Sequence, residues 1–193
     1  MSAESQELRV VALVGSLRRA SYTRRLVQAL GILAPPELNI ETVPLGNLPL
    51  YNEDAETATP PAQWRNFRDR VKRADAILFA TPEYNRSVPG ALKNAIDVGS
   101  RPYGASVWTG KPAAVLSVSP GALGAFGANH HLRQSLVFLD MPVLQQPEAY
   151  IGGIAQLIDP SGEVTRPDTQ AFLRQFLEQF ERWIRQQRLK VAP

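Results

Sequence analysis

One stretch of the chain joins a stiff backbone to polar and aromatic side chains. Residues 81–90 read TPEYNRSVPG, and their two prolines fix φ and hold the backbone still. Tyr84 offers a flat face, whereas Glu83, Asn85 and Ser87 offer polar atoms. A rigid loop of this composition can hold a flat ring with polar edges. The same composition also suits a well-made turn without a ligand, and the residues alone leave both interpretations open.

A second stretch, residues 15–23, carries groups that suit a phosphate. Ser16, Ser21 and Thr23 add hydroxyl donors, and Arg18 adds a fixed cation. The amides at the start of a helix here would carry partial positive charge. The stretch contains neither G-x-G-x-x-G nor G-x-x-x-x-G-K-S/T, so neither a dinucleotide Rossmann site nor a P-loop is indicated. The plain alternative is a capped helix with Ser21 as its N-cap.

Both stretches follow apolar runs that predict buried strands. Residues 8–14 read LRVVALV, and residues 74–80 read ADAILFA. A helix should follow each loop, because leucines recur at helical spacing after the first loop and Pro89 suits the first turn of a helix to about Ser100. In an open parallel sheet, ligands bind beyond the carboxyl ends of the strands. Both loops would lie there.

The rest of the chain continues the alternation of strands and helices. The aromatic and aliphatic stripe of the last helix suits a core face. Five strands alternating with five helices predict an α/β fold, a flavodoxin-like three-layer sandwich whose five-stranded parallel sheet has the order 2-1-3-4-5 and helices on both faces. In this order the loops after strands one, three and four can converge on one site. We expect the remaining strands at residues 38–43, 111–118 and 142–144, and the remaining helices from Pro60 through Val71, from Ala128 to Asp140 and from Pro167 to about Gln187.

Composition predicts a single domain spanning residues 1–193. Hydrophobic residues make up 44% and charged residues 20%, as in an ordinary globular protein that can bury a substantial core. The chain has no cysteine, which excludes disulfides, thiolate metal sites and a cysteine nucleophile. His130 and His131 are adjacent and lack a carboxylate at ligand spacing. We therefore expect no metal site, and expect these histidines to meet a hydrogen-bond partner or a neighbouring subunit.

Charge and hydropathy limit the classes of partner that we expect. The net charge is +3, and the densest basic group, between Arg18 and Arg25, lies beside the predicted phosphate loop. Modest positive charge can steer small anions toward a site. We expect no nucleic-acid partner, because no recognition module is visible. No apolar run approaches a membrane span and residues 1–7 lack a signal-peptide pattern, so we expect no membrane partner and a cytoplasmic location.

Two segments keep two interpretations each. Residues 45–59 form a long irregular connection that is either a surface crossover, which we favour, or a functional loop. Tyr103 and Trp108 lie in a turn-rich segment and either line a pocket edge or fill the core. We favour the core for Trp108.

Several motifs together resemble a known family. The resemblance runs from about Val10 to Asp168, and its central motif is long and specific. It points to the NADPH-dependent FMN reductase family and, within it, to the chromate and quinone reductase branch. The motifs are TPEYN at residues 81–85, SVPGALKNAID at 87–97, GSLRRAS at 15–21 and HLRQSLVFLD at 131–140.

This resemblance implies a flavoenzyme. The cofactor would be FMN, the electron donor NADPH or NADH, and the acceptor a small molecule: a quinone, an azo dye, a nitroaromatic compound, chromate or free flavin. The family's pattern implies ping-pong kinetics, no acid–base catalytic residue, and a homodimer or homotetramer. It also places the glycine-rich residues 119–127 beside the flavin ring, although composition alone would allow a flexible connector. The implied cofactor-binding residues are Ser16, Arg18, Ser21, Thr23, Pro82, Glu83, Tyr84, Asn85, Ser87, Ser119, Gly121 and Gly124.

Two other functions stay open. An FMN electron carrier like flavodoxin would bind the same cofactor without turning over NAD(P)H itself, but such carriers are usually acidic and this chain is basic. A scaffold that kept the fold and lost the cofactor is the third possibility. It would purify colourless and could not be reconstituted with FMN.

Overall fold

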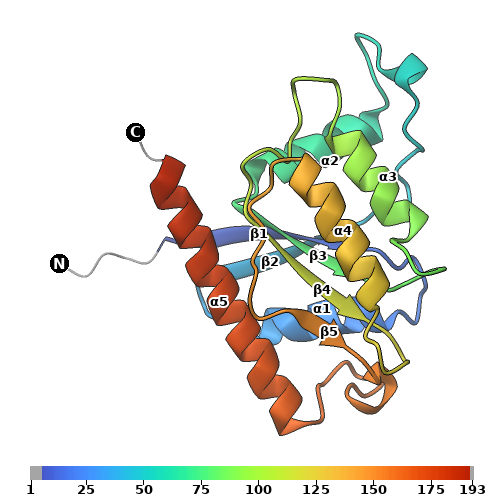
Figure 1. The fold of residues 1–193 in the computed structure, drawn as a ribbon. Coiled ribbons are helices and arrows are strands. Elements are labelled where there is room, and N and C mark those ends of the chain that lie inside the picture. Colours follow the sequence, from blue (N-terminus) through green and yellow to red (C-terminus); the bar gives the residue numbers. More distant parts are fainter. Residues whose placement is uncertain (1–5, 192–193) are drawn as a thin grey trace.

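The computed structural model describes residues 6–191, with side chains described up to Leu189. Residues 1–5, part of the segment without a signal-peptide pattern, and residues 192–193 lie outside the described residues. Apart from two short 3-10 helices, Glu53–Ala55 and Ile154–Gln156, the described residues form ten elements in which strands and helices alternate (Figure 1). They are β1 (Leu8–Val14), α1 (Tyr22–Leu33), β2 (Leu38–Val43), α2 (Ala62–Arg73), β3 (Ala76–Thr81), α3 (Gly90–Gly99), β4 (Ala113–Val118), α4 (Phe126–Phe138), β5 (Ala149–Ile151) and α5 (Pro167–Val191).

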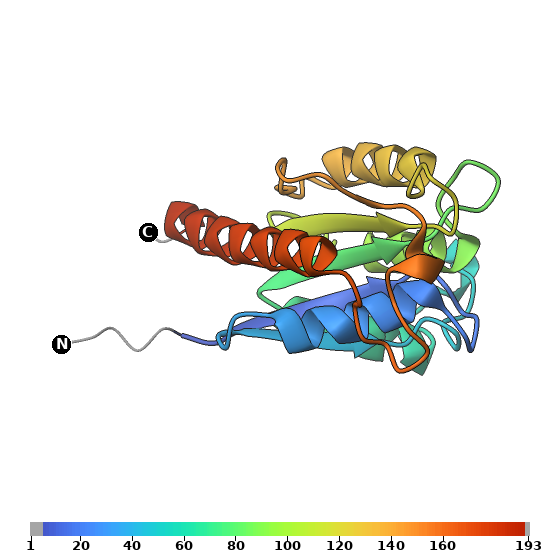
Figure 2. The same ribbon diagram turned by 90° about the horizontal axis from the view of Figure 1, so that it is seen from below.

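The five strands form one parallel sheet in the order β2-β1-β3-β4-β5. The predicted fold is therefore confirmed. β1 pairs with both β2 and β3, so the strand order reverses between β1 and β3. Because all strands run the same way, the loops that follow them leave from one edge of the sheet, as Figures 1 and 2 show. We call this the carboxyl edge, and the opposite one the amino edge.

Two apolar cores cover the two faces of the sheet. Helices α1 and α5 pack on one face, where Leu30 and Phe176 are fully or almost fully buried. Helices α2, α3 and α4 pack on the other face, around Trp64 and Leu132. Successive residues of β1 alternate between the two cores, as expected of a strand that is buried on both sides.

The predicted fifth strand was wrong in position. The structure has β5 at Ala149–Ile151, paired with the end of β4, whereas Val143 forms only an isolated bridge to Ala113. Leu144 still donates to the carbonyl of Ala113 at 2.8 Å. Pro147, which has no N–H to donate, follows within three residues and interrupts the ladder. The edge strand is thus split, and its regular part comes later than the apolar run suggested.

Other boundaries moved by a few residues. Helix α4 begins at Phe126, not at Ala128, and α5 extends to Val191. Trp108 is fully buried, which confirms its place in the core, and Gly99 leaves room for it: a Cβ there would lie 2.3 Å from the indole ring. Tyr103 is 93% exposed and fills no core.

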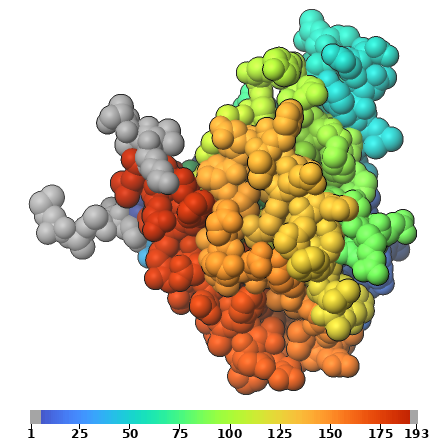
Figure 3. Space-filling model, viewed as in Figure 1, coloured from blue at the N-terminus to red at the C-terminus, as the bar shows by residue number. Residues whose placement is uncertain are grey.

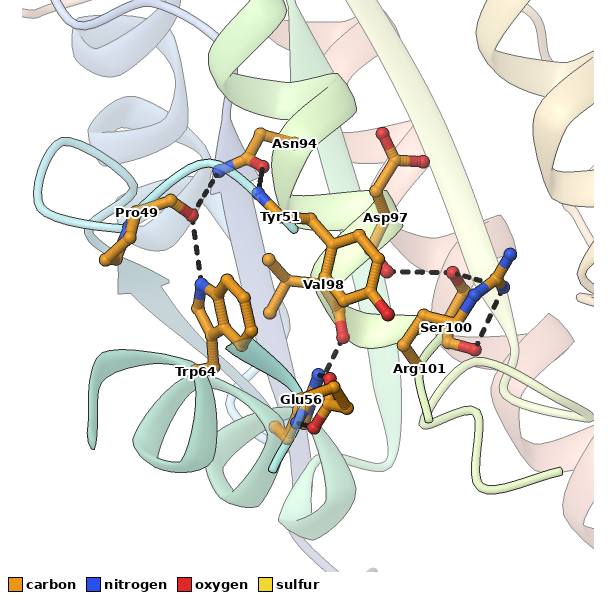
Figure 4. Close-up of polar contacts among 10 residues, drawn as sticks. Pro49, Tyr51, Glu56, Trp64, Asn94, Asp97, Val98, Ser100 and Arg101 are labelled. Atoms are coloured by element: carbon orange, nitrogen blue, oxygen red, sulfur yellow. Dashed lines mark hydrogen bonds and ion pairs between the residues drawn. The ribbon is translucent and has the colours of Figure 1, made fainter. Parts of the chain in front are cut away.

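The long connection after β2 lies against α2 and α3 (Figure 4). Asn94 of α3 accepts from the amide of Tyr51 at 2.8 Å and donates to the carbonyl of Pro49 at 3.0 Å. The indole of Trp64 donates to the same Pro49 carbonyl at 2.9 Å. The buried amide of Asn94 and the indole of Trp64 thus hold the first half of the connection.

A buried ion pair fastens the second half of this connection. Arg68 of α2 bonds both carboxylate oxygens of Glu56, at 2.8 and 2.6 Å, and donates to the carbonyl of Val98 on α3. The side chains of the pair are only 8% and 11% exposed.

Within residues 6–191, no helix is long and apolar enough to cross a membrane.

Candidate functional site

The loops after β1 and β3 touch each other at the carboxyl edge. The amide of Gly15 donates to the carbonyl of Ala80 at 2.8 Å. A Cβ on Gly15 would lie 3.2 Å from the ring of Pro82 and 3.4 Å from that of Pro89. These separations are tighter than nearly all real Cβ contacts, so a side chain at position 15 would require the neighbouring rings to shift. The predicted convergence of these loops is confirmed.

The loop between β1 and α1, together with the first turn of α1, contains three buried residues that carry hydroxyl groups. Ser16, Ser21 and Thr23 are each at most 4% exposed, whereas Arg18 is exposed. The Ser21 hydroxyl accepts from the amide of Arg24 at 3.2 Å, so Ser21 is the N-cap of α1 as predicted. The first turn of α1 holds no acidic residue, and its partial positive charge is therefore uncompensated there.

Three side-chain donors at this helix start bond nothing within residues 6–191. Among the hydrogen bonds and ion pairs of the described residues, none uses the side chain of Ser16, Arg18 or Thr23. Ser16 also lines a surface pocket of about 240 Å³ together with Arg24 and Asn47. A helix N-terminus with spare hydroxyls and a spare guanidinium has the donor set that a phosphate requires.

The loop after β3 contains a tight, strained turn. Tyr84 and Ser87 exchange backbone hydrogen bonds at 3.1 and 3.0 Å. Between them, Asn85 and Arg86 have φ of 52° and 64°, the left-handed region that residues other than glycine rarely enter. Such strain persists where the surroundings hold it, and it gathers at functional sites. In Figure 3 the green segment around residues 83–88 projects from the side of the molecule.

The predicted ring-binding residues divide into two groups. Tyr84 is 47% exposed and Asn85 is exposed, so both side chains remain accessible. The side chains of Glu83 and Ser87 are engaged by α4: Glu83 accepts from the amide of Ala128 at 3.0 Å, and Ser87 bonds His131 at 3.1 Å. Within residues 6–191 the amides of Glu83 and Asn85 have no partner. The backbone amides of Glu83 and Asn85, together with the side chains of Tyr84 and Asn85, are therefore the available groups of this loop.

The glycine-rich loop after β4 packs on the end of β5. Gly124 has φ of 57°, and a Cβ there would lie 2.6 Å from the backbone of Tyr150. Its glycine is thus required by chain packing, whatever else the loop contacts. The hydroxyl of Ser119 donates to the carbonyl of Gly121 at 2.9 Å, which closes a local turn. Gly121 itself is exposed.

A buried polar network below this loop was missed from the sequence. The hydroxyl of Ser117 donates to the carbonyl of Gly124 at 2.7 Å and accepts from Asn129 at 3.1 Å. Arg133 donates to Asn129 at 2.9 Å, and burial lowers the pKa of this guanidinium. The spacing of Asn129 and Arg133, four residues apart on one helix, was the available signal. The network fixes the loop from beneath.

An aromatic cluster lies beside the same loop. The ring of His130 is 4.2 Å from that of Phe126, and its Nε2 is 2.9 Å from the hydroxyl of Tyr150. Burial, followed by Glu148, raises the pKa of Tyr150 to about 12. Both histidines thus have hydrogen-bond partners within the chain, one of the two outcomes expected for them. No group of three or more histidine or acidic residues among the described residues could hold a metal ion.

The comparison with known proteins agrees with this geometry. Residues 8–156 match the sequence model of the family described as NADPH-dependent FMN reductase. A protein named quinone reductase from Pseudomonas putida strain KT2440 is 59% identical over 181 residues, which are 94% of this chain and 97% of the relative. A 2-hydroxy-1,4-benzoquinone reductase from a Burkholderia species is 42% identical over 182 residues, covering 94% and 99%.

A solved structure shows the same architecture. FerB, a flavoenzyme described as an NAD(P)H:(acceptor) oxidoreductase from Paracoccus denitrificans, superposes with a TM-score of 0.88. It is 41% identical to this chain and covers 93% of it, while 99% of the FerB chain is matched.

Proposed function

Because this chain belongs to the NADPH-dependent FMN reductase family, we propose that it is an FMN-containing quinone reductase driven by NADPH or NADH. That it is an oxidoreductase using FMN and NAD(P)H follows from the family and its relatives. The proposal adds the acceptor class, the residues that hold the cofactor and the kinetic order. It treats residues 1–193 as one FMN-binding domain.

The observation that carries the proposal is the set of spare donors at the start of α1. In it, the hydroxyls of Ser16 and Thr23, which no described residue uses, bind phosphate oxygens. Arg18 closes over them as a fixed cation. Ser21 keeps its capping role and holds the helix end open toward the ligand. An uncompensated helix N-terminus adds the remaining attraction.

The loop after β3 holds the ring. Pro82 fixes the chain beside Gly15, and the free amides of Glu83 and Asn85 donate to the polar edge of the ring system. The exposed ring of Tyr84 covers part of its apolar surface. Ser87 contributes indirectly, because its hydroxyl is bonded to His131. In this loop the proposed contacts to the ring come mainly from backbone groups and less from side chains.

The loop after β4 closes the other side of the ring. In the proposal Ser119, Gly121 and Gly124 line it, and the exposed backbone at Gly121 allows close approach. FMN, when bound, supplies the capacity to accept and donate hydride. The protein binds and orients, and we assign no acid–base catalytic residue.

We infer ping-pong kinetics from one shared substrate space. The nicotinamide and the acceptor would occupy it in turn, giving NAD(P)⁺ and hydroquinone from NAD(P)H, a proton and a quinone. Quinones are the favoured acceptors, because relatives at 59% and 42% identity are named quinone reductase and 2-hydroxy-1,4-benzoquinone reductase. The other acceptors to be tested beside quinones are azo dyes, nitroaromatics, chromate and free flavin.

The test is a flavin spectrum of the purified chain, followed by initial rates. We expect bound FMN, quinone-dependent oxidation of NADPH or NADH, and parallel lines in double-reciprocal plots at several quinone concentrations. Lines that intersect would indicate a ternary complex and refute the shared space. Bound flavin without quinone-dependent turnover would instead support the electron carrier.

The proposal also includes a homodimer or homotetramer. Helix α4 leaves Val137 and Phe138 76% and 85% exposed, an unusual position for a large apolar pair. Light scattering after size exclusion should give two or four times the monomer mass. Phe138→Glu should reduce that mass.

A further inference from the structure

Helix α4 begins without a capping side chain of its own. The residue at its N-cap is Ala125, which has φ of 61° and offers no side-chain hydrogen bond. A helix N-terminus leaves its first amides unpaired, and Ser, Thr, Asp or Asn normally fills this place. The missing group comes from a distant loop.

Glu83 supplies the cap across the site. Its carboxylate Oε2 accepts from the amide of Ala128 at 3.0 Å. Ala128 is the third residue of α4, the position whose amide a capping side chain usually bonds. The carboxylate also opposes the partial positive charge of the helix end.

Gly127 makes room for this carboxylate. A Cβ on Gly127 would lie 2.9 Å from Oε2 of Glu83 and 3.0 Å from the carbonyl of Arg86. Both separations are at or near the closest that real Cβ atoms show, so a side chain here would require the Glu83 carboxylate or the Arg86 carbonyl to shift. Glu83 and Gly127 therefore form a matched pair.

A second contact holds the far side of the same turn. His131, one helical turn after Gly127, bonds the hydroxyl of Ser87 at 3.1 Å. The strained pair, Asn85 and Arg86, lies between the two fastenings. Because strained backbone relaxes unless it is held, these contacts keep the turn in one shape.

We propose that Glu83 is a positioning residue for the cofactor: by capping α4 from the opposite loop, it fixes the backbone that receives the flavin ring. This inference rests on the proposed function, because it concerns the same site. It goes beyond that function in giving the side chain of Glu83 a task separate from ring contact, and in pairing it with Gly127.

The consequence is a ring-binding loop that is ready before the ligand arrives. When only a fraction of molecules holds the competent shape, the apparent dissociation constant rises by the inverse of that fraction. Removing the carboxylate should therefore weaken FMN binding without removing any group that touches FMN. Losing one charge-assisted hydrogen bond corresponds to about tenfold.

The experiment compares Glu83→Ala, Glu83→Gln, Gly127→Ala and the double variant Glu83→Ala with Gly127→Ala. Glu178→Ala, an exposed carboxylate on the remote helix α5, is the matched control. FMN is titrated into each apoprotein and followed by quenching of flavin fluorescence. Hydrogen exchange of residues 126–131 in the apoproteins reads the cap directly, and thermal melting confirms folding.

We expect Glu83→Ala to raise the FMN dissociation constant about tenfold and to deprotect the start of α4. Glu83→Gln should rescue most of both effects, because its amide oxygen can accept the same hydrogen bond. Gly127→Ala should resemble Glu83→Ala, and adding it to Glu83→Ala should cost less than about twofold, because interacting residues are not additive.

Three results would overturn the inference. Wild-type affinity in Glu83→Ala would remove the positioning role alone, since the wild-type chain would still bind FMN. Fully additive effects at positions 83 and 127 would show that the two residues act separately. A wild-type chain that binds no FMN would overturn the proposed function together with this inference.

Discussion

The two edges of the sheet differ in how their polar and charged side chains are bonded. At the carboxyl edge, the side chains of Ser16, Arg18 and Thr23 bond no other described residue. At the amino edge, several charged groups are bonded within the chain: Asp75 with Arg188, Glu41 with Arg70, and Lys111 with backbone carbonyls. Asp75 accepts from the amide of Arg9 at 2.7 Å and from the guanidinium of Arg188.

The amino edge nevertheless has the larger hollows. One of about 560 Å³ lies beside Asp75, Lys111 and Arg188, and one of about 500 Å³ lies beside Arg70 and Glu41. Lys111 donates to the carbonyls of Ala74 and Lys72, and Arg70 pairs with Glu41. Volume alone would have placed the site at this edge. The site that we propose lies at the other edge, because Ser16, Arg18 and Thr23 gather there at a helix N-terminus without an acidic residue.

The strongest test of this contrast is the addition of FMN to the apoprotein. At a free concentration 100 times the dissociation constant, binding should raise the free energy of unfolding by about 2.7 kcal/mol. Hydrogen exchange should slow in residues 15–23, 82–89 and 119–127, and should not change at the amino edge. Slower hydrogen exchange around Lys111 and Arg188 would show that FMN binds at the amino edge, and would contradict the comparison of the two edges.

Matched arginine substitutions at the two edges should give opposite results. Arg18→Ala should weaken FMN binding by about tenfold or more, because it removes a charge-assisted contact to phosphate. It should leave the free energy of unfolding of the apoprotein within about 0.5 kcal/mol of wild type, since the side chain has no partner to lose.

Arg188→Ala is the counterpart at the amino edge. It should lower the free energy of unfolding by about 1 kcal/mol or less, because its ion pair with Asp75 is partly exposed. For each variant, FMN titration gives the dissociation constant and urea unfolding gives the free energy of unfolding. Unchanged FMN affinity in Arg18→Ala, or weakened affinity in Arg188→Ala, would contradict the comparison.

Two serines of one loop should separate binding from folding. Ser21→Ala removes the N-cap of α1 and should cost about 1 kcal/mol of stability, measured by urea unfolding of the apoprotein. Ser16→Ala should leave that stability near wild type, because no described residue uses its hydroxyl. Its effect should appear only when FMN is titrated. A large stability loss in Ser16→Ala would show that its hydroxyl has a structural task.

The buried elements could be predicted from the sequence because their pattern is local. β1 and β2 have the predicted bounds, since each is an apolar or alternating run closed by turn residues. β5 could not, because a short edge strand gains its pairing from β4 and not from its own residues. The apolar run at Val143 looked more like a strand than the one that pairs regularly.

The candidate site was predictable in its loops and not in its contacts. The convergence of the loops follows from strand order alone. The capping contact between Glu83 and Ala128 joins residues 45 positions apart, and no local pattern announces it. The sequence likewise shows a glycine at position 124 without showing the backbone of Tyr150 against it. Long-range contacts decide which side chains remain free for a ligand.

The smallest expected effect concerns Lys111 at the amino edge. Burial lowers the pKa of this amine below its usual 10.5, with Asp75 opposing the shift. Between the lowered value and 10.5 the unfolded chain binds more protons than the folded one, so Lys111 makes stability rise with pH through that window. Lys111→Met should remove this rise, which urea unfolding at a series of alkaline pH values would detect as a difference between the two proteins. NMR titration of the Lys111 side chain should give the same pKa with and without FMN, because an amine bonded to backbone carbonyls at the far edge has no part in holding the cofactor. An FMN-dependent shift of that pKa would mean that the two edges are coupled, and that their separation into a binding edge and a structural edge is wrong.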